Sequence, residues 1–369
     1  MFKNSIQIGT LWGIPLKLHY SFLIVLPFLA WAFGNNIRVL AEMADVPITS
    51  LGANPYILGL FMSLALFTSV ALHELAHSVV ARQKGVHIHS INLMLFGGVA
   101  QMEELPENPR DEAMIAFAGP LLSLVLGGFL LGTMYFLGRG IVPDIQLLFV
   151  YLGWLNIFLA VFNLLPAFPT DGGRVLRALL ARRIPFVKAT RIAANIGKAF
   201  AFGLGLLGFL SFNFILVFIA FFIYIGASQE YQTIFIKYTL EGFSVSDLMT
   251  RDVQVVFEDT TLAQLMDRMF NERHSGYPVV DREGRLTGCV TMEDIQKVEP
   301  KDHLTTRVRD IMSMEIKRVR PDEEIYRALR IMSKEDVGRL MVMDGEELVG
   351  IITRSDIMKG FRLRQMISD

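Results

Sequence analysis

The chain has 369 residues, of which 52% are hydrophobic and only 19% are charged, a balance typical of a membrane protein. Its formal net charge of -1 gives no argument for binding to nucleic acid. The single cysteine, Cys289, excludes an internal disulfide and a metal cage built from thiolates.

Polarity is distributed unevenly along the chain. Residues 1–240 contain long uncharged runs, whereas residues 243–369 have the charge density of a soluble domain. Apolar and polar residues alternate in residues 5–10, which predicts a short strand before the first apolar run. The predicted fold is therefore a polytopic α-helical membrane domain with a short β element, followed by a soluble α+β part.

Four apolar runs before residue 170 are candidate membrane spans, at about residues 19–33, 56–81, 113–137 and 147–165. Residues 199–229 contain no charge, which is too long for one span and short for two. Basic residues gather at 82–84 and 174–198, and the positive-inside rule places these segments in the cytoplasm. A hairpin near residues 211–213 then returns the chain to the cytoplasm. We predict about six spans with both termini cytoplasmic.

The second apolar run contains the sequence HELAH, which begins at His73 and ends at His77. Two imidazoles and a carboxylate are costly in a membrane unless a buried partner or a cavity compensates them. Residues four apart share one face of a helix, so the two histidines are placed to bind one zinc ion and leave a position for water. Glu74 lies about 100° further round the helix, where it is placed to take a proton from that water. Chance HExxH matches usually lie on surface helices, so this position favours a zinc peptidase site within the bilayer.

The fourth apolar run ends in a segment that breaks its helix. Pro166 and Pro169 remove backbone donors, and non-helical backbone at membrane depth is tolerated only around a protein-lined cavity. Asp171 stands at the start of the helix that follows. An aspartate there is most often an N-cap, but the HExxH pair lacks a third ligand. We therefore predict a site of two histidines and one aspartate, with Asp171 as the third ligand.

Taken together, these motifs resemble the site-2 protease family of intramembrane zinc metalloproteases. HELAH in the second span and NLLPAFPTDGG at 163–173 carry the resemblance, and FGGV at 96–99 and AGP at 118–120 match family patterns in the same order. The resemblance covers most of residues 1–235. It implies that His73, His77 and Asp171 bind one zinc ion per chain and that Glu74 is the catalytic base.

The same resemblance implies roles for three further residues. Asn163 matches a family asparagine that helps to hold the reacting carbonyl, which makes it a second catalytic residue. The strand around residues 96–100 resembles an edge strand that pairs with unwound substrate, with Gly97 and Gly98 as substrate-binding residues. A helical substrate hides its peptide bonds and has to be extended before water attacks. A plain tight turn is the alternative for the two glycines.

The C-terminal part contains an internal repeat with a period of roughly sixty residues. The sequence VSDLMT at 245–250 recurs as VRDIMS at 308–313, and GCVTMED at 288–294 recurs as GIITRSD at 350–356. Each copy reads strand, helix, two strands, helix. This pattern resembles a tandem pair of cystathionine-β-synthase (CBS) domains, which we place at 243–300 and 305–361, after a metalloprotease domain at 1–240.

CBS pairs often bind adenine nucleotides in the cleft between their repeats. The resemblance puts Thr291 and Thr353 near phosphate, and Asp294 and Asp356 on ribose hydroxyls, with ATP, ADP or AMP as the ligand. A hydroxyl donates to phosphate and a carboxylate accepts from a diol. Two alternatives stay open: the motif ends a strand and caps a helix, or the pair serves only to form a homodimer.

The leading hypothesis is a zinc-dependent intramembrane endopeptidase that cleaves membrane-protein substrates in or near their transmembrane segments and is regulated by adenine nucleotide at the CBS pair. The alternatives are a CBS-regulated transporter and an inactive nucleotide-sensing scaffold. HELAH argues against the first alternative and the intact Glu74 against the second. By analogy, we expect a multi-pass protein of a prokaryotic plasma membrane.

Overall fold

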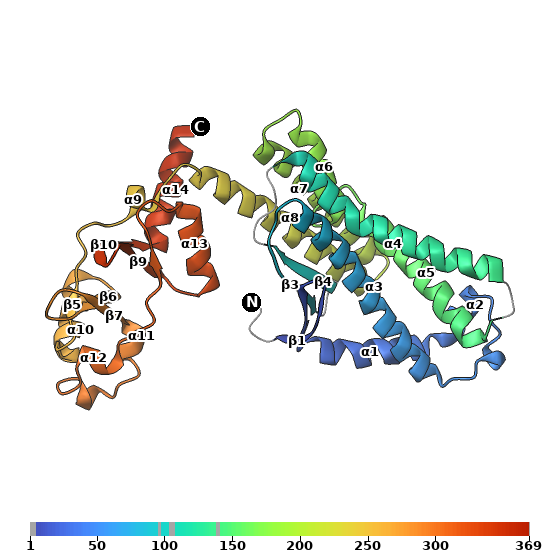
Figure 1. Cartoon of the computed structure of the whole chain (residues 1–369), viewed down its shortest axis with the longest axis horizontal. Coiled ribbons are helices and arrows are strands. Elements are labelled where there is room, and N and C mark those ends of the chain that lie inside the picture. The colour runs from blue at the N-terminus through green and yellow to red at the C-terminus, as the bar shows by residue number, and fades with distance from the viewer. Residues whose placement is uncertain (1–4, 95–96, 103–107, 138–140, 369) are drawn as a thin grey trace. The chain divides into compact units, whose positions relative to one another are not determined.

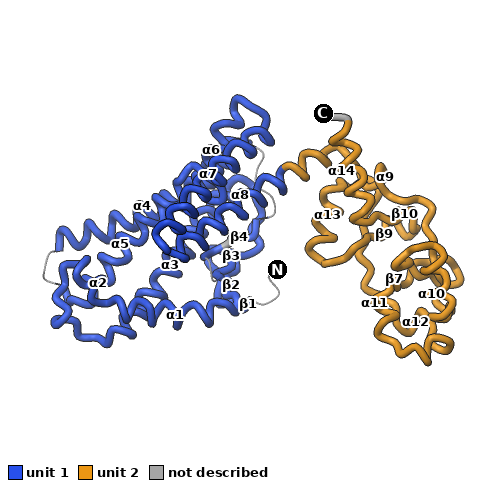
Figure 2. The backbone as a smooth tube through the Cα atoms, turned by 180° about the vertical axis from the view of Figure 1, so that it is seen from behind, with its two compact units in different colours: residues 1–234 blue, residues 235–369 orange. Residues whose placement is uncertain are grey.

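The computed structural model describes residues 5–94, 97–102, 108–137 and 141–368. Their contacts divide the chain into two compact units, Met1–Ile234 and Phe235–Asp369, which Figure 2 draws in different colours. Long helices dominate the first unit, whereas strands alternate with shorter helices in the second (Figure 1).

The first unit is built mainly from helices. These are α1 (Phe22–Asn35), α2 (Ile37–Met43), α3 (Pro55–Gln83), α4 (Pro109–Leu137), α5 (Pro143–Asn163), α6 (Asp171–Ala181), α7 (Phe186–Leu210) and α8 (Phe214–Leu240), the last of which ends in the second unit. Five of the described helices, α3, α4, α5, α7 and α8, are long and apolar enough to cross a membrane. The pair α1 and α2 adds a sixth candidate if it is counted as one broken span. The predicted helical membrane domain of about six spans is confirmed.

The first candidate span differs in detail from a simple helix. α1 has 14 residues, which corresponds to about 21 Å, less than the roughly 30 Å of a bilayer core. The chain then bends by 67° into α2. The uncharged run at 199–229, in contrast, forms the predicted hairpin, because α7 ends at Leu210 and α8 begins at Phe214.

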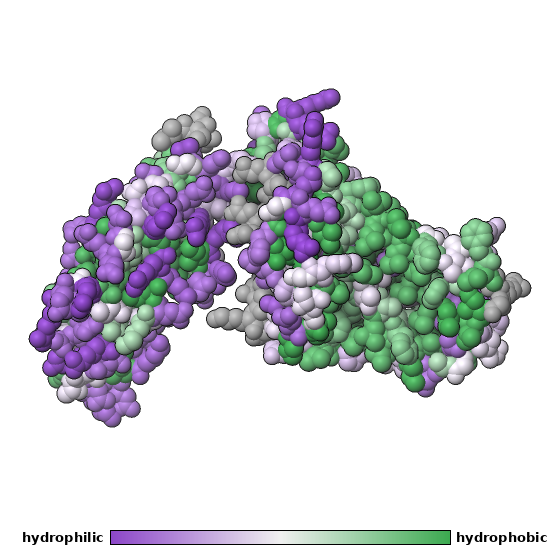
Figure 3. Space-filling view, in the orientation of Figure 1, coloured by the Kyte–Doolittle hydropathy of each residue, from purple (hydrophilic) through white to green (hydrophobic). Residues whose placement is uncertain are grey.

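The surface of the first unit is apolar, as a surface in contact with lipid requires. Figure 3 shows hydrophobic residues gathered over this unit, whereas hydrophilic residues dominate the face of the second. Large aromatic side chains stay exposed on its helices, with Phe129 at 68%, Phe202 at 75% and Phe221 at 58%. Water-soluble monomers rarely expose so many large apolar side chains on one contiguous surface.

A four-stranded sheet accompanies these helices. Its strands are β1 (Ser5–Leu11), β2 (Ile14–His19), β3 (Ile88–Met94) and β4 (Gly97–Met102), in the order β1-β2-β3-β4. β1 confirms the strand predicted from alternation. β4 lies at the edge and pairs antiparallel with β3, with Gly98 opposite Leu93. Gly97, the first residue of β4, has a φ of +124°, a conformation that favours glycine. Phe96, at the start of the predicted strand, lies outside the described residues.

The second unit contains two three-stranded sheets, β5-β6-β7 and β10-β9-β8. Its elements are α9 (Val245–Leu248), β5 (Val256–Phe257), α10 (Leu262–Glu272), β6 (Gly276–Val280), β7 (Leu286–Thr291), α11 (Met292–Ile295), α12 (Val308–Ile311), β8 (Arg318–Val319), α13 (Ile325–Lys334), β9 (Arg339–Asp344), β10 (Glu347–Thr353) and α14 (Arg354–Ser368), besides the short 3-10 turn Pro300–Asp302. Each repeat has the predicted order of strand, helix, two strands and helix, so the α+β pair is confirmed.

The two repeats exchange the segments with which they begin. Val245 of α9, at the start of the first repeat, is buried in the core of the second repeat with Ile325 and Ile352. Val308 of α12, at the start of the second repeat, is buried in the core of the first. Short backbone bridges accompany the exchange, since Thr250 pairs with Ile351 and Cys289 with Ser313. The core of each repeat is therefore completed by the first segment of the other.

Candidate metal centre

His73 and His77 lie one turn apart on α3, and both side chains are buried. Their rings meet edge to face, with centroids 4.8 Å apart. Nδ1 of His77 lies 2.6 Å from the carbonyl oxygen of Ile115, and Nδ1 of His73 lies 2.9 Å from Oγ of Ser123. Because α4 engages both Nδ1 atoms, the two Nε2 atoms are left to face a common partner.

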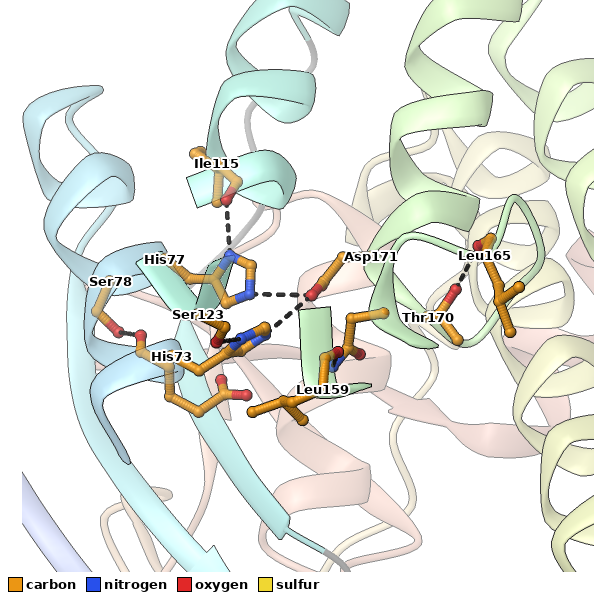
Figure 4. Close-up of polar contacts among 11 residues, drawn as sticks. His73, His77, Ser78, Ile115, Ser123, Leu159, Leu165, Thr170 and Asp171 are labelled. Atoms are coloured by element: carbon orange, nitrogen blue, oxygen red, sulfur yellow. Dashed lines mark hydrogen bonds and ion pairs between the residues drawn. The ribbon is translucent and has the colours of Figure 1, made fainter. Parts of the chain in front are cut away.

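That partner is Asp171, the first residue of α6. Its Oδ2 lies 3.2 Å from Nε2 of His73 and 3.1 Å from Nε2 of His77 (Figure 4). The ligand atoms of the three residues all lie within 4.8 Å of one another, and within the described ranges no second group of three such residues is found. The structure thus brings together the three residues that the sequence predicted as metal ligands.

The loop between α5 and α6 delivers Asp171 to this position. Thr170 is the residue that precedes α6, and its hydroxyl donates to the carbonyl oxygens of Leu165 at 2.6 Å and Ala167 at 2.7 Å. A Cβ at Gly172 would lie 2.3 Å from the carbonyl oxygens of Leu164 and Leu165. The first turn of α6 therefore packs directly on the loop backbone.

The residues present fit a zinc ion. Two imidazole nitrogens and one carboxylate oxygen form the three-ligand set of catalytic zinc sites, which keep a further position open. Both imidazoles are also oriented through their second nitrogen, as ligating histidines usually are. A Cβ at Gly119 would lie 2.3 Å from Nε2 of His77 and 2.7 Å from Nε2 of His73. Only glycine at this position of α4 leaves space beside the ligand atoms.

Glu74 lies between the two histidines in sequence and faces the sheet. A Cβ at Gly98 would lie 2.6 Å from Cγ of Glu74, so the edge strand β4 passes directly beside it. Oγ of Ser78 donates to the backbone carbonyl of Glu74 at 2.8 Å, so this hydrogen bond does not involve the Glu74 carboxylate. No described residue donates a hydrogen bond to the Glu74 carboxylate, so this group remains available to act on a water molecule.

Asn163 is the last residue of α5, at the other end of the loop that leads to Asp171. Its Nδ2 donates to the carbonyl oxygen of Leu159 at 2.9 Å, within the same helix. Among the described residues the structure shows no hydrogen bond between Asn163 and the two histidines or Asp171. Its role in holding the reacting carbonyl therefore stays a prediction.

The residues predicted to bind nucleotide form helix caps in the structure. Oδ2 of Asp294 accepts from the backbone nitrogen of Thr291 at 3.0 Å and from its hydroxyl at 2.7 Å. Oδ2 of Asp356 accepts in the same way from Thr353, at 3.2 and 2.6 Å. The capping alternative for these motifs is therefore present in both repeats.

One basic residue joins the two motifs. Arg339 opens β9 and pairs with Thr353 of β10, and its guanidinium donates to the carbonyl oxygen of Gly276 at 2.5 Å and to Oγ of Ser275 at 2.8 Å. Gly276 pairs in turn with Thr291. The sequence analysis missed Arg339, Ser123 and the Ile115 carbonyl, because no spacing rule relates them to the motifs they contact.

Both units of the chain match models of known protein families. The model of the CBS domain family matches residues 245–301 and 308–362, and that of peptidase family M50 matches residues 61–141 and 141–204. Zinc metalloprotease MJ0392 of Methanocaldococcus jannaschii is 36% identical over 362 residues, which are 98% of this chain and 97% of that one. The solved structure of a site-2 protease from the same organism is 39% identical, covers 62% of this chain and 95% of its own, and gives a TM-score of 0.43.

The similarity to the archaeal zinc metalloprotease extends over nearly the full length of both chains. The M50 match includes His73, Glu74, His77 and Asp171. The apolar helices of the first unit agree with an enzyme of the membrane. This chain belongs to peptidase family M50, the site-2 protease family of zinc metalloproteases, and it carries a tandem pair of CBS domains.

Proposed function

We propose that the chain is an intramembrane endopeptidase that hydrolyses peptide bonds within or near the transmembrane segments of other membrane proteins. One observation carries the proposal: Nε2 of His73 and Nε2 of His77 converge on Oδ2 of Asp171, at 3.2 and 3.1 Å, in a unit of long apolar helices. His73, His77 and Asp171 hold one zinc ion, and Glu74 acts beside it.

A zinc ion held by His73, His77 and Asp171 would supply a Lewis acid that activates a water molecule and polarises the carbonyl group of the scissile peptide. Glu74 accepts the proton of the attacking water and donates it to the leaving amine nitrogen. General acid–base catalysis of this kind contributes roughly 10²- to 10⁴-fold to a rate. Asn163, at the end of α5, donates a hydrogen bond to the carbonyl oxygen as negative charge develops on it.

The edge strand β4 is the proposed binding site for the substrate backbone. An edge strand offers free backbone donors and acceptors, and an extended peptide adds to it as a further strand. Gly98 lies against Glu74, and Gly97 frees the start of the strand from side-chain bulk. Pairing with β4 therefore extends an unwound transmembrane segment and brings its peptide bond to Glu74.

A single substitution tests this assignment. Glu74→Gln keeps the size of the side chain but cannot accept a proton. In the purified full chain in detergent, we expect about one zinc ion per chain in this variant, with cleavage of a fluorogenic single-span peptide reduced about 100-fold or more. Glu42→Gln, which changes an exposed carboxylate on α2, is the matched control. Wild-type cleavage by Glu74→Gln would remove Glu74 as the general base.

We further propose the arrangement of the chain in the membrane. Residues 1–240 form the metalloprotease domain, and residues 243–300 and 305–361 form the two CBS repeats. Basic residues at 82–84 and 174–198 support a multi-pass protein with both termini in the cytoplasm. Similarity to an archaeal protein supports a prokaryotic plasma membrane.

Adenine nucleotide is the proposed regulatory ligand of the CBS pair. Thr291 and Asp294 in one repeat, and Thr353 and Asp356 in the other, offer hydroxyls and carboxylates for phosphate and ribose. Arg339 supports the proposal, because its guanidinium lies where the two sheets meet and guanidinium groups bind phosphate well. Nucleotide changes the cleavage rate only if it binds two states of the protein with different affinity.

Calorimetric titration of the full chain with ATP, ADP and AMP tests the regulatory proposal. We expect dissociation constants in the micromolar to millimolar range and a nucleotide-dependent cleavage rate. Asp294→Ala or Asp356→Ala should weaken binding. No heat signal at millimolar nucleotide would instead indicate that the pair is a homodimerisation or docking module.

A further inference from the structure

A buried cluster of charges connects helices of the candidate metal centre. Arg177 of α6 and Glu112 of α4 each have side chains that are only 1% exposed. Nε of Arg177 donates to Oε1 of Glu112 at 2.8 Å, and its Nη2 donates to the same oxygen. Nη1 donates to Oε1 of Glu230 on α8 at 3.0 Å. One guanidinium thus joins α4, α6 and α8.

Aromatic rings hold the same guanidinium from two further directions. Its central carbon lies 4.9 Å from the ring centroid of Phe168 and 4.8 Å from that of Phe186. Phe168 belongs to the loop that ends at Asp171, and Phe186 begins α7. A planar, forked cation satisfies both carboxylates and both rings at once, which the compact ammonium of lysine cannot do.

Stability alone is a weak explanation for this cluster. Removing charges from water is costly, and replacing a buried ion pair by apolar side chains is often neutral or stabilising. Oε2 of Glu112 is buried and has no hydrogen-bond partner among the described residues, which adds to the cost. The more specific consequence of such a pair is that it fixes one arrangement of the helices that carry it.

That arrangement is the one on which the metal centre depends. Glu112 and Ile115 are three residues apart on α4, and the Ile115 carbonyl engages Nδ1 of His77. Arg177 follows Asp171 by six residues on α6, a rise of about 9 Å. The ion pair therefore joins α6 to α4 within one turn of the His77 contact and within two turns of the third ligand.

We propose that Arg177 is a positioning residue for the third zinc ligand. By locking α6 onto α4, the Arg177–Glu112 pair holds the carboxylate of Asp171 against the two imidazoles that α4 orients. The stacked ring of Phe168 extends the same restraint to the loop before Asp171. This inference rests on the proposed function, because it requires Asp171 to bind the metal.

Arg177→Lys tests the inference, since it keeps the charge and removes the fork. In the full chain in detergent, zinc affinity is measured by competition with a chelator, together with the rise in melting temperature that zinc produces. We expect zinc affinity about tenfold weaker, as for loss of a group that orients a ligand, and a smaller zinc-induced rise. Arg183→Lys, at an exposed position just after α6, should match wild type.

A purely structural role predicts a different result. It would lower the melting temperature of the metal-free protein and leave zinc affinity unchanged, and that outcome overturns the proposal. Glu112→Gln provides a second variant if Arg177→Lys does not fold. It removes the pairing charge with little change of shape, and we expect zinc affinity to fall several-fold; wild-type affinity there also overturns the proposal.

Asp171→Ala separates the two levels of inference. If that variant keeps wild-type zinc affinity, Asp171 is not a ligand and the proposed metal site fails. If zinc is lost in Asp171→Ala but retained at wild-type affinity in Arg177→Lys, the metal site stands and only the positioning role fails.

Discussion

An aspartate near the start of a helix behaves differently in the two units of this molecule. In the second unit, Asp294 and Asp356 turn their carboxylates back onto their own helices, where each accepts two hydrogen bonds from the threonine three residues earlier. In the first unit, Asp171 opens α6 but directs Oδ2 at histidines that lie 98 and 94 residues away in the chain.

The difference follows from the donors near each carboxylate. A threonine three residues before an aspartate builds a capping box, which satisfies the carboxylate locally. Three residues before Asp171 stands Phe168, which has no side-chain donor, and the hydroxyl of Thr170 is bonded to loop carbonyls. The carboxylate of Asp171 therefore stays available for a distant partner. An aspartate without a local donor, placed in an apolar unit, is the one to examine for function.

The largest expected effect comes from removing the carboxylate of Asp171 from the metal centre. Asp171→Ala removes a proposed ligand, so zinc affinity should fall by more than the roughly 10- to 100-fold typical of outer partners, and cleavage should cease. Asp294→Ala is the control for zinc content, because it removes an aspartate from the first turn of a helix in the other unit. Zinc content measured by mass spectrometry would contradict the comparison if both variants kept a full complement.

Gly119→Ala is expected to have a smaller but still large effect. The added methyl would stand within 2.7 Å of both Nε2 atoms, so zinc binding and cleavage should be strongly reduced. Gly128→Ala on the same helix has open space around the new methyl and should behave as wild type in both measurements. Equal zinc affinity in the two alanine variants would show that α4 does not approach the ligands as closely as described.

The smallest effect concerns the cap in the first CBS repeat. Burial opposes the charged form of Asp294, but hydrogen bonds from Thr291 and Lys297 outweigh it and lower the pKa of the carboxyl. A lowered pKa stabilises the folded state above the unfolded pKa, and this contribution is lost as pH falls through the folded pKa. Asp294→Asn should therefore cost about 1 kcal/mol at neutral pH and less in acid.

Thermal unfolding of the full chain at neutral pH and below about pH 4 checks this prediction. Asp336→Asn is the control, because the side chain of Asp336 is 99% exposed and its ion pair with Arg354 is long, at 3.7 Å. A cost of Asp294→Asn that stayed constant across this range would show that the charge of Asp294 does not contribute to the cap.

Sequence reasoning predicted best what depends on local pattern. The apolar runs gave the helices, the alternation at residues 5–10 gave β1, and the repeat gave the elements of the second unit. The HELAH string and the broken segment before Asp171 led to the residues that meet in space. Each of these features depends on residues that are close together in the sequence.

What sequence reasoning missed depends on contacts between distant segments. The bend between α1 and α2 has no proline at the break, and the turn-forming residues Gly34, Asn35 and Asn36 that stand there do not by themselves give its angle of 67°. Arg177 read as one more basic residue of a cytoplasmic cluster, because its partners Glu112 and Glu230 lie 65 and 53 residues away. Ser123 belongs to no motif, and it contacts His73 only because α4 packs on α3.

The exchange of α9 and α12 between the two CBS repeats has a consequence for how the pair unfolds and for what a single repeat can do alone. Neither repeat forms a complete core by itself, since Val245 is buried in the core of the second repeat and Val308 in the core of the first. A fragment that contains one copy alone therefore lacks a residue of its own core. The pair should accordingly melt in one cooperative transition, and a cut at residues 299–307 would separate each half from part of its own interior.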